Sequence, residues 1–420
     1  MDNKSLNILY ITSRFPAMSM TFVANEMKAV TEAGCNVELL SLWPPNSNHS
    51  GHPVETLFID RVQYAKILNL KNVRRMVRAL IVKPSVILTF FSLVPGHLKS
   101  PLVLAKLILS LPRGLIAGTY ALEKNVDIIH AHFLSMPTSV AMIASKISGV
   151  PFTATAHAFD ITSTHPLRLN GSVKKKCETA AAVVTISHHN VTDILSRWPS
   201  LKNIRIDVIY NGIDTTSFSP PSSDKKIRVA DDPLSIVSVS NLNEKKGFSF
   251  LIKAVSSLIE DGKDVYLNIY GEGPERSKLE KLIESNGHQD RIVLHGSIDQ
   301  TMVANLCKKA DVFVLASIPL STGDADGLPT VLIESLGSSL PTISTQVAGI
   351  PEIVINGKTG LCVPPEDVNA LAEAILWVAD FPTEASKLAE NGRNLVTSEF
   401  NQKFTSQQLI SLWDDCIKIS

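Results

Sequence analysis

The chain has 420 residues, of which 45% are hydrophobic and 19% are charged, and its formal net charge at pH 7 is zero. This ordinary globular composition and this length indicate two or three folded domains and exclude a fibrous or disordered chain. The charge is unevenly spread, because residues 1–210 hold 22 Lys and Arg against 12 Asp and Glu, whereas residues 211–420 hold 18 against 28. A basic first half is typical of a protein that meets an anionic partner such as a lipid phosphate or a membrane surface.

The five cysteines are scattered, with no C-x-x-C pair, which argues against a disulfide scaffold and favours a reducing compartment. The N-terminal residues contain no apolar stretch long enough for a signal peptide and are typical of a first strand instead. We therefore expect a cytoplasmic protein. The chain has no basic-aromatic RNA motif and no zinc-finger spacing, so nucleic acid is not an expected partner.

Short apolar, β-branched runs alternate with helical patterns along the first half of the chain. Such near-continuous apolar strands, separated by helices such as those expected at 20–33 and 136–147, are typical of parallel sheets covered on both faces. The expected strands are residues 6–12, 36–41, 126–130, 151–156, 182–186 and 205–210.

Two segments within this half, 84–96 and 100–122, are unusually apolar. The first has about 13 residues, where a membrane span needs roughly 20. The second is interrupted by Lys106, Pro112 and Arg113. Two interpretations remain open: buried helices, or a surface that lies on the cytoplasmic face of a membrane.

Residues 211–233 are rich in proline and small polar residues and predict a linker or hinge loop. After it the alternation of strands and helices restarts, and three helices close the chain. We predict an α/β fold with two Rossmann-like, doubly wound domains facing a cleft, whose ligands bind at the carboxyl ends of the strands. The expected strands of the second domain are residues 234–239, 265–270, 291–295, 312–316, 341–344 and 360–363.

The segment from Asp326 to Glu334 follows the expected strand 312–316 and has the features of an anion site. Pro329 suits the first turn of a helix, and Gly327 lets the backbone approach a ligand closely. The amides at such a helix start suit a diphosphate, and a carboxylate at Glu334 can accept two hydrogen bonds from a ribose diol. The alternative is a capped amphipathic helix with a solvated Glu334.

The stretch 326–354 resembles the signature of the retaining glycosyltransferases of family 4, which have the GT-B fold. Residues 236–254 resemble the G-R-L-x-x-x-K-G segment of that family, and residues 269–279 resemble its G-x-G-P turn. The N-terminal half resembles the subgroup that builds exopolysaccharide and colanic acid. The matching residues of this half include Arg14, Ser19, Glu26, His130, His132, His157 and Asp160.

The resemblance implies transfer of a sugar from a UDP- or GDP-sugar to a glycan or lipid-diphosphate-linked acceptor in cell-surface polysaccharide or lipopolysaccharide biosynthesis, with no metal or other cofactor. It also implies an acceptor domain at 1–210, a donor domain at 211–400, and a C-terminal helix at 401–420 that packs back on the first domain. The implied catalytic residues are His157, Asp326 and Lys246. The implied donor-binding residues are Asn241, Lys246, Gly271, His295, Gly296, Gly327, Leu328, Pro329, Thr330, Val331 and Glu334, and the acceptor-side residues are Arg14, Ser19 and Asp160.

The chain departs from the family pattern at three places. Asp326 stands where Glu is usual, Asn241 stands where the family has Arg, and Met20 stands where the subgroup has Glu. Because Asn lacks the charge with which Arg clamps a diphosphate, Lys246 and the amides of 327–331 must carry more of that role. Two alternatives are a catalytically degenerate GT-B binding or scaffold subunit and a sugar-nucleotide epimerase.

Several further residues have two interpretations. His157 either contacts the transferring sugar or phosphate, or is a core histidine. His130 and His132 have the residue type of a metal pair, but no third ligand is evident, so no metal is expected. Asp324-x-Asp326 and Gly271-x-Gly273 match metal and dinucleotide patterns only in part. The run 174–176 is three lysines, either a solvated helix face or a contact with anionic lipid.

Overall fold

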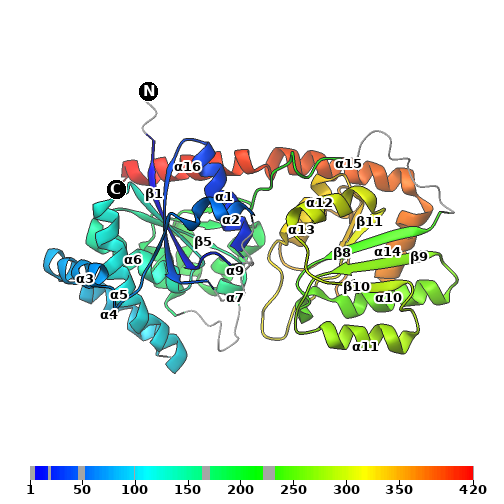
Figure 1. Ribbon diagram of the computed structural model, residues 1–420, viewed down its shortest axis with the longest axis horizontal. Coiled ribbons are helices and arrows are strands. Elements are labelled where there is room, and N and C mark those ends of the chain that lie inside the picture. Colours follow the sequence, from blue (N-terminus) through cyan, green and yellow to red (C-terminus); the bar gives the residue numbers. More distant parts are fainter. Residues whose placement is uncertain are drawn as a thin grey trace. The chain divides into compact units, whose positions relative to one another are not determined.

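The computed structural model describes residues 5–17, 20–45, 53–98, 100–162, 171–220 and 232–419. The chain forms two compact units (Figure 1). Unit 1 comprises Met1–Gly212 and Gln402–Ser420, and unit 2 comprises Ile213–Asn401. All twelve strands expected from the sequence are present, with ends that differ from the predicted ones by at most two residues. The two-domain α/β prediction is confirmed.

Unit 1 contains a seven-stranded sheet in the order β3-β2-β1-β4-β5-β6-β7, and every neighbouring pair is parallel. The short strand β3 was not predicted, because its three residues are only half buried and show no apolar run. The strands are β1 (Asn7–Arg14), β2 (Asn36–Trp43), β3 (Val62–Tyr64), β4 (Ile128–His132), β5 (Phe152–Ala156), β6 (Ala182–Thr185) and β7 (Ile206–Val208).

Helices cover both faces of this sheet, as the alternation of residues in β1 shows. Leu9 and Ile11 pack in a core with α5 and α6, whereas Ile8 and Tyr10 pack in a second core with α1 and α16. The helices of unit 1 are α1 (Thr21–Glu32), α2 (Pro53–Ile59), α3 (Leu70–Val82), α4 (Val86–His97), α5 (Pro101–Glu123), α6 (Met136–Ser148), α7 (Phe159–Thr162), α8 (Val173–Thr179), α9 (His188–Arg197), the 3-10 helix η2 (Pro199–Asn203) and α16 (Gln402–Ile419).

Helix α16, red in Figure 1, belongs to the core of unit 1 although it ends the chain. Trp413 is fully buried, and its indole N–H donates to the Thr153 hydroxyl at 3.1 Å. The Gln402 side chain donates to the Asn25 carbonyl of α1 at 2.9 Å.

The two apolar segments of the first half form α4 and α5, which with α3 lie between β3 and β4 in the chain. Helix α5 packs closely on α6, and 56% of its most apolar window is buried within the protein. Among the described residues, α5 alone is long and apolar enough to cross a membrane, or two spans are counted if the bent pair α3–α4 is taken as one. The interpretation as core helices is therefore confirmed for much of α5, whereas α3 and α4 leave several apolar side chains exposed.

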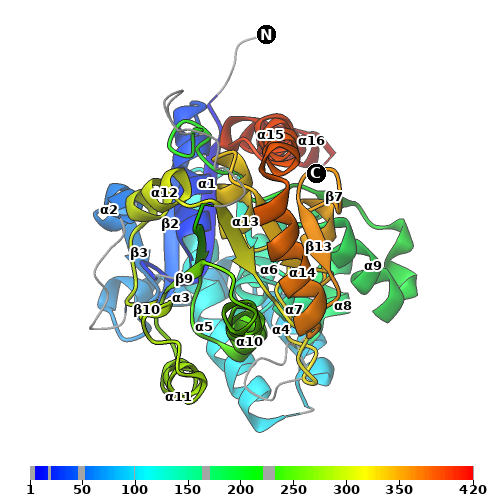
Figure 2. The same cartoon turned by 90° about the vertical axis from the view of Figure 1, so that its right-hand side faces the viewer.

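Unit 2 contains a six-stranded parallel sheet in the order β10-β9-β8-β11-β12-β13. Helices α10, α11 and α14 pack on one face of it, and Figure 2 shows α10 and α14 together on that face. The elements are β8 (Leu234–Val239), η3 (Glu244–Lys246), α10 (Phe248–Glu260), β9 (Val265–Tyr270), α11 (Arg276–Asn286), β10 (Ile292–His295), α12 (Gln300–Lys309), β11 (Val312–Leu315), α13 (Thr330–Gly337), β12 (Thr342–Thr345), η4 (Ile350–Glu352), β13 (Leu361–Val363), α14 (Val368–Asp380) and α15 (Pro382–Glu399).

Candidate functional site

The predicted donor-binding residues of unit 2 follow four adjacent strands of its sheet. Asn241 and Lys246 follow β8, Gly271 follows β9, Gly296 follows β10, and the segment 326–334 follows β11. Because these strands are parallel and neighbours in the sheet, their carboxyl ends lie at one edge. The fold thus gathers the predicted residues of unit 2 at a single edge of the sheet.

A cluster of two lysines and two aspartates lies at this edge. Lys246 Nζ is 2.9 Å from Asp326 Oδ2, and Lys245 Nζ is 3.1 Å from Asp324 Oδ1 and 3.6 Å from Asp326 Oδ1. The Ser317 hydroxyl donates to Asp326 Oδ2 at 2.6 Å. Burial alone raises the pKa of Asp326, but Lys246 and Lys245 outweigh it, so the pKa lies below its usual value and the carboxylate is ionised at neutral pH.

The backbone of two loops holds these lysines in place. The Ile318 N–H donates to the Lys245 carbonyl at 2.9 Å, which ties η3 to the loop after β11. Gly247 has φ +64°, and a Cβ there would collide with the Ala316 carbonyl, so only glycine allows this close approach. Asn241 is exposed, and its carbonyl accepts the Asn243 N–H. The missing arginine therefore leaves an uncharged side chain at an open position.

Gly271, His295 and Gly296 lie at the ends of β9 and β10, the two strands that follow β8 in the order of the sheet. The Gly271 N–H donates to the Gly296 carbonyl at 3.1 Å, and a Cβ at Gly271 would collide with the Ser240 carbonyl. The His295 ring stacks on Tyr270 with centroids 4.3 Å apart and planes inclined by 10°. Burial and the nearby Arg276 lower the pKa of His295, which favours the neutral ring at neutral pH.

Helix α13 begins at Thr330, and Pro329 is its N-cap residue rather than part of its first turn. The first amides of any helix lack partners within the helix, so the start of α13 offers donors to an anion. Glu334 is only 8% exposed, and its Oε1 accepts from the Gln300 side chain at 3.0 Å. The alternative of a solvated Glu334 is therefore wrong. Burial raises the pKa of Glu334 to about 7.

In unit 1, His157 directly follows β5 and is 7% exposed. Phe22 and Phe133 flank its ring, with centroids 4.8 and 4.6 Å away. Asp160 is buried, and its two oxygens accept the N–H groups of His157 at 2.7 Å and Leu134 at 2.6 Å. Asp160 therefore ties the ends of β4 and β5 together and fixes the backbone that carries His157.

The other acceptor-side residues are less closely connected. Arg14 ends β1, and its guanidinium donates to the Pro44 carbonyl at 2.8 Å. Strand β4 separates β1 from β5, so Arg14 and His157 follow strands that are not neighbours. Ser19 lies outside the described residues.

The lysine run at 174–176 is not uniformly solvated. Lys174 and Lys175 are exposed, whereas Lys176 is only 1% exposed and donates to the carbonyls of Leu134 and Ser135 at 3.0 and 2.9 Å. Burial lowers the pKa of Lys176 to about 7. Both interpretations of the run, a solvated face or a lipid contact, are therefore wrong for Lys176, which braces the loop after β4.

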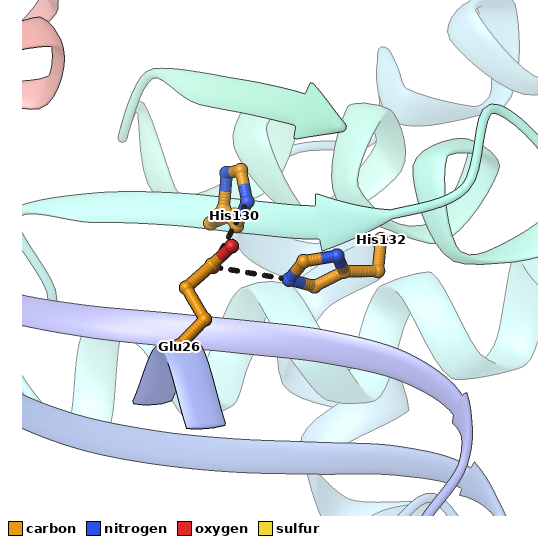
Figure 3. Close-up of side chains that lie close together, drawn as sticks. All are labelled: Glu26, His130 and His132. Atoms are coloured by element: carbon orange, nitrogen blue, oxygen red, sulfur yellow. Dashed lines mark hydrogen bonds and ion pairs between the residues drawn. The ribbon is translucent and has the colours of Figure 1, made fainter. Parts of the chain in front are cut away.

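Glu26 of α1 reaches the two histidines of β4, as Figure 3 shows. Its Oε1 lies 3.7 Å from His130 Nε2 and 3.2 Å from His132 Nε2, so three atoms of the ligand type lie within 4.8 Å of one another. Residue spacing does not reveal Glu26 as the third group, because it lies 104 positions before His130 in the sequence and only the fold brings the two together.

The hydrogen bonds of this cluster are complete without a metal. His130 has the Thr153 hydroxyl 2.8 Å from Nδ1 and the Thr155 hydroxyl 3.1 Å from Nε2. His132 has His157 Nε2 3.0 Å from its Nδ1, and the Tyr10 hydroxyl donates to Glu26 Oε1 at 2.9 Å. Each ring nitrogen of the pair is thus engaged by a side chain. The donor set fits a buried polar network better than a metal centre.

Comparison with known proteins agrees with this architecture. The model of Glycosyltransferase Family 4 matches residues 20–217, and the model of Glycosyl transferases group 1 matches residues 221–395, so the two together span nearly the whole chain. The chain is 27% identical to the putative colanic acid biosynthesis glycosyltransferase WcaL of Salmonella typhimurium, over 97% of this chain and 99% of that protein. It is 34% identical to the protein of the same name from Escherichia coli, over half of each chain.

Among solved structures, Anabaena Alr3699/HepE in complex with UDP-glucose has the same fold. Its TM-score is 0.71 at 18% identity, over 98% of this chain and all of that one. Both halves of the chain and their order along the sequence thus match those of known glycosyltransferases. The chain belongs to the glycosyltransferases of family 4, with the GT-B fold of two Rossmann-like units.

Proposed function

We propose that this glycosyltransferase moves a sugar from a nucleoside diphosphate sugar to a glycan or lipid-linked acceptor in the biosynthesis of a cell-surface polysaccharide, with retention of anomeric configuration and without a metal. The observation that carries the proposal is the Lys246–Asp326 pair beside the start of α13 in unit 2. The similarity to proteins named for colanic acid biosynthesis supports the choice of acceptor class.

The chemistry of the leaving group explains this arrangement. When the sugar departs, negative charge develops on the diphosphate, and catalysis depends on positive groups already aimed at it. Lys246 and the amides at the start of α13 supply such groups at the edge of the sheet, and the α13 dipole adds to them. Asp326 holds the Lys246 ammonium at 2.9 Å and can orient a sugar hydroxyl with its other oxygen.

The nucleoside half of the donor has its own partners in the proposal. Glu334 is a buried carboxyl group with one hydrogen bond, from Gln300, and it has acceptor capacity left for a ribose diol. The stacked rings of Tyr270 and His295 offer a flat apolar surface next to Gly296, which suits the base. UDP and GDP are the candidate nucleotides.

Unit 1 receives the acceptor in this scheme. His157, held by Asp160 and flanked by two aromatic rings, contacts the transferring sugar or an acceptor hydroxyl. The leaving phosphate takes the proton of the acceptor hydroxyl, so the protein supplies electrostatic stabilisation and positioning rather than a covalent nucleophile.

The test is transfer by the wild type and by Glu334→Ala and Lys246→Ala, after thermal-shift screening of UDP- and GDP-sugars has found a donor that stabilises the fold. Both variants should lose transfer while remaining folded as judged by circular dichroism, although Lys246→Ala should melt several degrees lower because Asp326 loses its main counter-charge. Full transfer in both would overturn the donor site. Failure of every nucleotide sugar to bind would favour a degenerate binding subunit, and release of an epimerised donor would favour the epimerase.

We further propose that α3 and α4 rest on the cytoplasmic face of an anionic membrane. On α3, the side chains of Leu70, Val73, Val77, Leu80 and Ile81 are exposed and recur at the spacing of one helical stripe. The basic residues Lys71, Arg74 and Arg78 form the adjoining stripe, and all three are exposed. An exposed apolar stripe beside a basic one is typical of a helix that lies in the interface of a bilayer.

The charge of this segment supports an anionic partner. Residues 61–122 contain ten Lys and Arg and no Asp or Glu, whereas the other residues of 1–210 hold twelve of each sign. The whole positive excess of the first half therefore arises from residues 61–122, which hold α3, α4 and all of α5 except its last residue, Glu123. Helix α4 adds Leu88 and Phe91, which are 71% and 58% exposed.

Flotation with vesicles tests this contact. The wild type should bind vesicles that contain phosphatidylglycerol, bind neutral phosphatidylcholine vesicles weakly, and lose binding as salt rises. The double variant Val77→Ser/Ile81→Ser should bind weakly to both. The control Ile419→Ser removes an equally exposed apolar side chain from α16 and should bind as the wild type does. Equal binding by the double variant would overturn the contact.

A further inference from the structure

A chain of three side chains joins α1 to the residue that follows β5. Glu26 Oε1 lies 3.2 Å from His132 Nε2, and His132 Nδ1 lies 3.0 Å from His157 Nε2. We propose that Glu26 and His132 are positioning residues that fix the tautomer of His157, so that its Nδ1 presents a lone pair to a hydroxyl group of the substrate. The role of His157 toward substrate rests on the proposed function, whereas the tautomer itself does not.

The direction of the hydrogen bonds follows from the carboxylate. An ionised carboxylate only accepts, so the nitrogen of His132 that faces Glu26 must carry the proton. In the neutral form of His132 the single ring proton lies on the nitrogen that faces Glu26, and Nδ1 is then an acceptor. The nitrogen of His157 that faces it must donate, and this leaves the lone pair of His157 on Nδ1.

The protonation states support this order. Burial alone raises the pKa of Glu26, but His132 and His130 outweigh it, so the pKa lies below its usual value and the group is ionised at neutral pH. Burial, followed by the neighbouring His132 and His130, lowers the pKa of His157 well below its usual value, so this ring is neutral. A neutral His157 has one donor and one acceptor nitrogen, and the chain from Glu26 decides which is which.

The remaining charged and titratable groups around the chain are few among the described residues. The Tyr10 hydroxyl donates to the same oxygen of Glu26, and His130 Nε2 lies 3.7 Å from it. Asp160 accepts the backbone N–H of His157, and Lys176 acts on Asp160 through its charge. Within the described part of the chain, none of these four groups has a hydrogen bond to Nδ1 of His157. The tautomer of His157 is therefore set by Glu26, acting through His132.

The packing of aromatic rings holds the side chains of His132 and His157 in place. Phe22 lies one helical turn before Glu26 on α1, and its ring contacts that of His157 at a centroid distance of 4.8 Å. The rings of His132 and His157 are themselves stacked, with centroids 5.3 Å apart and planes inclined by 26°. Helix α1 therefore supplies both the charge and one wall of the ring's surroundings.

The tautomer can be read directly by nitrogen NMR on protein with 15N-labelled histidine, with no substrate present. In the wild type, His157 should show an unprotonated Nδ1 and a protonated Nε2. In Glu26→Gln, the amide can donate as well as accept, so both tautomers of His132 and His157 should appear. Tyr10→Phe, which removes the other hydrogen bond to Glu26 but keeps its charge, is the matched control and should leave the wild-type tautomer.

Transfer kinetics give a second readout that a purely structural role would not move. Glu26→Gln should lower kcat by about tenfold or more with a small change in KM, as expected for loss of a group that orients a functional histidine. The negative charge of Glu26 favours protonation of the neighbouring histidine rings. Its removal should therefore move the fall of kcat at acidic pH, the acid limb of the pH profile, to lower pH. Glu26→Asp, which keeps the charge, should retain the position of that limb.

His132→Gln interrupts the same row of hydrogen bonds at its second member. It is prepared in parallel with Glu26→Gln, and one of the two variants needs to fold for the test. A wild-type His157 tautomer together with a wild-type acid limb in either folded variant would overturn the proposal. If the wild-type protein transfers no sugar from any donor, the proposed function fails, whereas the NMR result still decides the tautomer.

Discussion

Lys246 and Asp326 lie 2.9 Å apart with only 12% and 5% of their side chains exposed. Removal of one partner from so buried a pair leaves an uncompensated charge, whereas replacement of both partners by neutral groups is much better tolerated. This asymmetry separates the contribution of the pair to stability from its contribution to catalysis.

Lys246→Met should lower the free energy of unfolding of unit 2 by about 3 kcal/mol, because Asp326 remains buried without its main counter-charge. Lys246→Met/Asp326→Asn should recover most of that loss. Both variants should still lose about a hundredfold or more in kcat, because the positive charge is gone from the leaving group. Urea denaturation and initial rates measure the two effects, and recovery of activity in the double variant would contradict the assigned role of Lys246.

Glu334 should make the stability of unit 2 depend on pH. Its pKa is about 7 in the folded protein, against ~4.3 for an unfolded glutamate. As pH rises between these values, the unfolded chain loses its proton first, so the stability of unit 2 falls, and above about pH 7 the penalty is constant at roughly 4 kcal/mol.

Glu334→Gln removes this penalty and keeps the acceptor for Gln300. The variant should therefore match the wild type near pH 4.5 and be more stable than the wild type at pH 8. Denaturation at the two pH values measures this, with Glu373→Gln, at an exposed position of α14, as the control. A difference between Glu334→Gln and wild type that does not grow with pH would contradict the elevated pKa.

Among individual residues, the sequence best predicts which ones are neighbours in the structure when they lie within one segment. Asp326 and Glu334 belong to a contiguous motif, so their neighbourhood at a strand-to-helix turn is predictable from local rules. Gln300 contacts Glu334 from 34 residues away along the chain. Lys245 contacts Asp324 from 79 residues away. Such contacts depend on the order of strands in the sheet, which a single sequence does not state.

At the scale of elements, strands were predictable because fully buried parallel strands are continuous apolar runs. The close packing of helices was not, and α5 against α6 is the example. A Cβ at Gly118 would lie 2.7 Å from Ile147 Cβ and 3.0 Å from the Ala144 carbonyl. The glycines of α5 therefore mark where α6 approaches, a meaning that becomes visible only when both helices are in place.

Gly118→Val should destabilise unit 1 by about 1–3 kcal/mol, because the added atoms force α5 and α6 apart. Ala105→Val, at an exposed position of the same helix, introduces the same β-branched residue where solvent accommodates it and should cost at most about 0.7 kcal/mol through its lower helix propensity. Thermal unfolding followed by circular dichroism distinguishes them. Equal effects of the two substitutions would contradict the α5–α6 contact as the cause, because Gly118→Val raises helix propensity whereas Ala105→Val lowers it.

At the scale of the whole molecule, the chain completes unit 2 between two parts of unit 1. Trp413→Ala should lower the free energy of unfolding of unit 1 by about 3–5 kcal/mol, because a large side chain is lost from a fully buried site. Hydrogen exchange should therefore speed up in β1 and β4 but not in β8 and β11. The reciprocal variant Trp377→Ala, in α14, should affect unit 2 alone, and faster exchange in both units for either variant would contradict independent cores.

The place of α16 has a consequence for synthesis on the ribosome. Unit 2 is one continuous stretch, Ile213–Asn401, and can fold once that stretch has left the exit tunnel. Unit 1 begins to emerge first but lacks Leu409, Leu412, Trp413 and Cys416 of its own core until α16 has followed unit 2 out of the ribosome. The unit whose synthesis begins first is therefore completed after the other, and a nascent chain halted between unit 2 and α16 carries an open apolar face that chaperones and proteases can recognise.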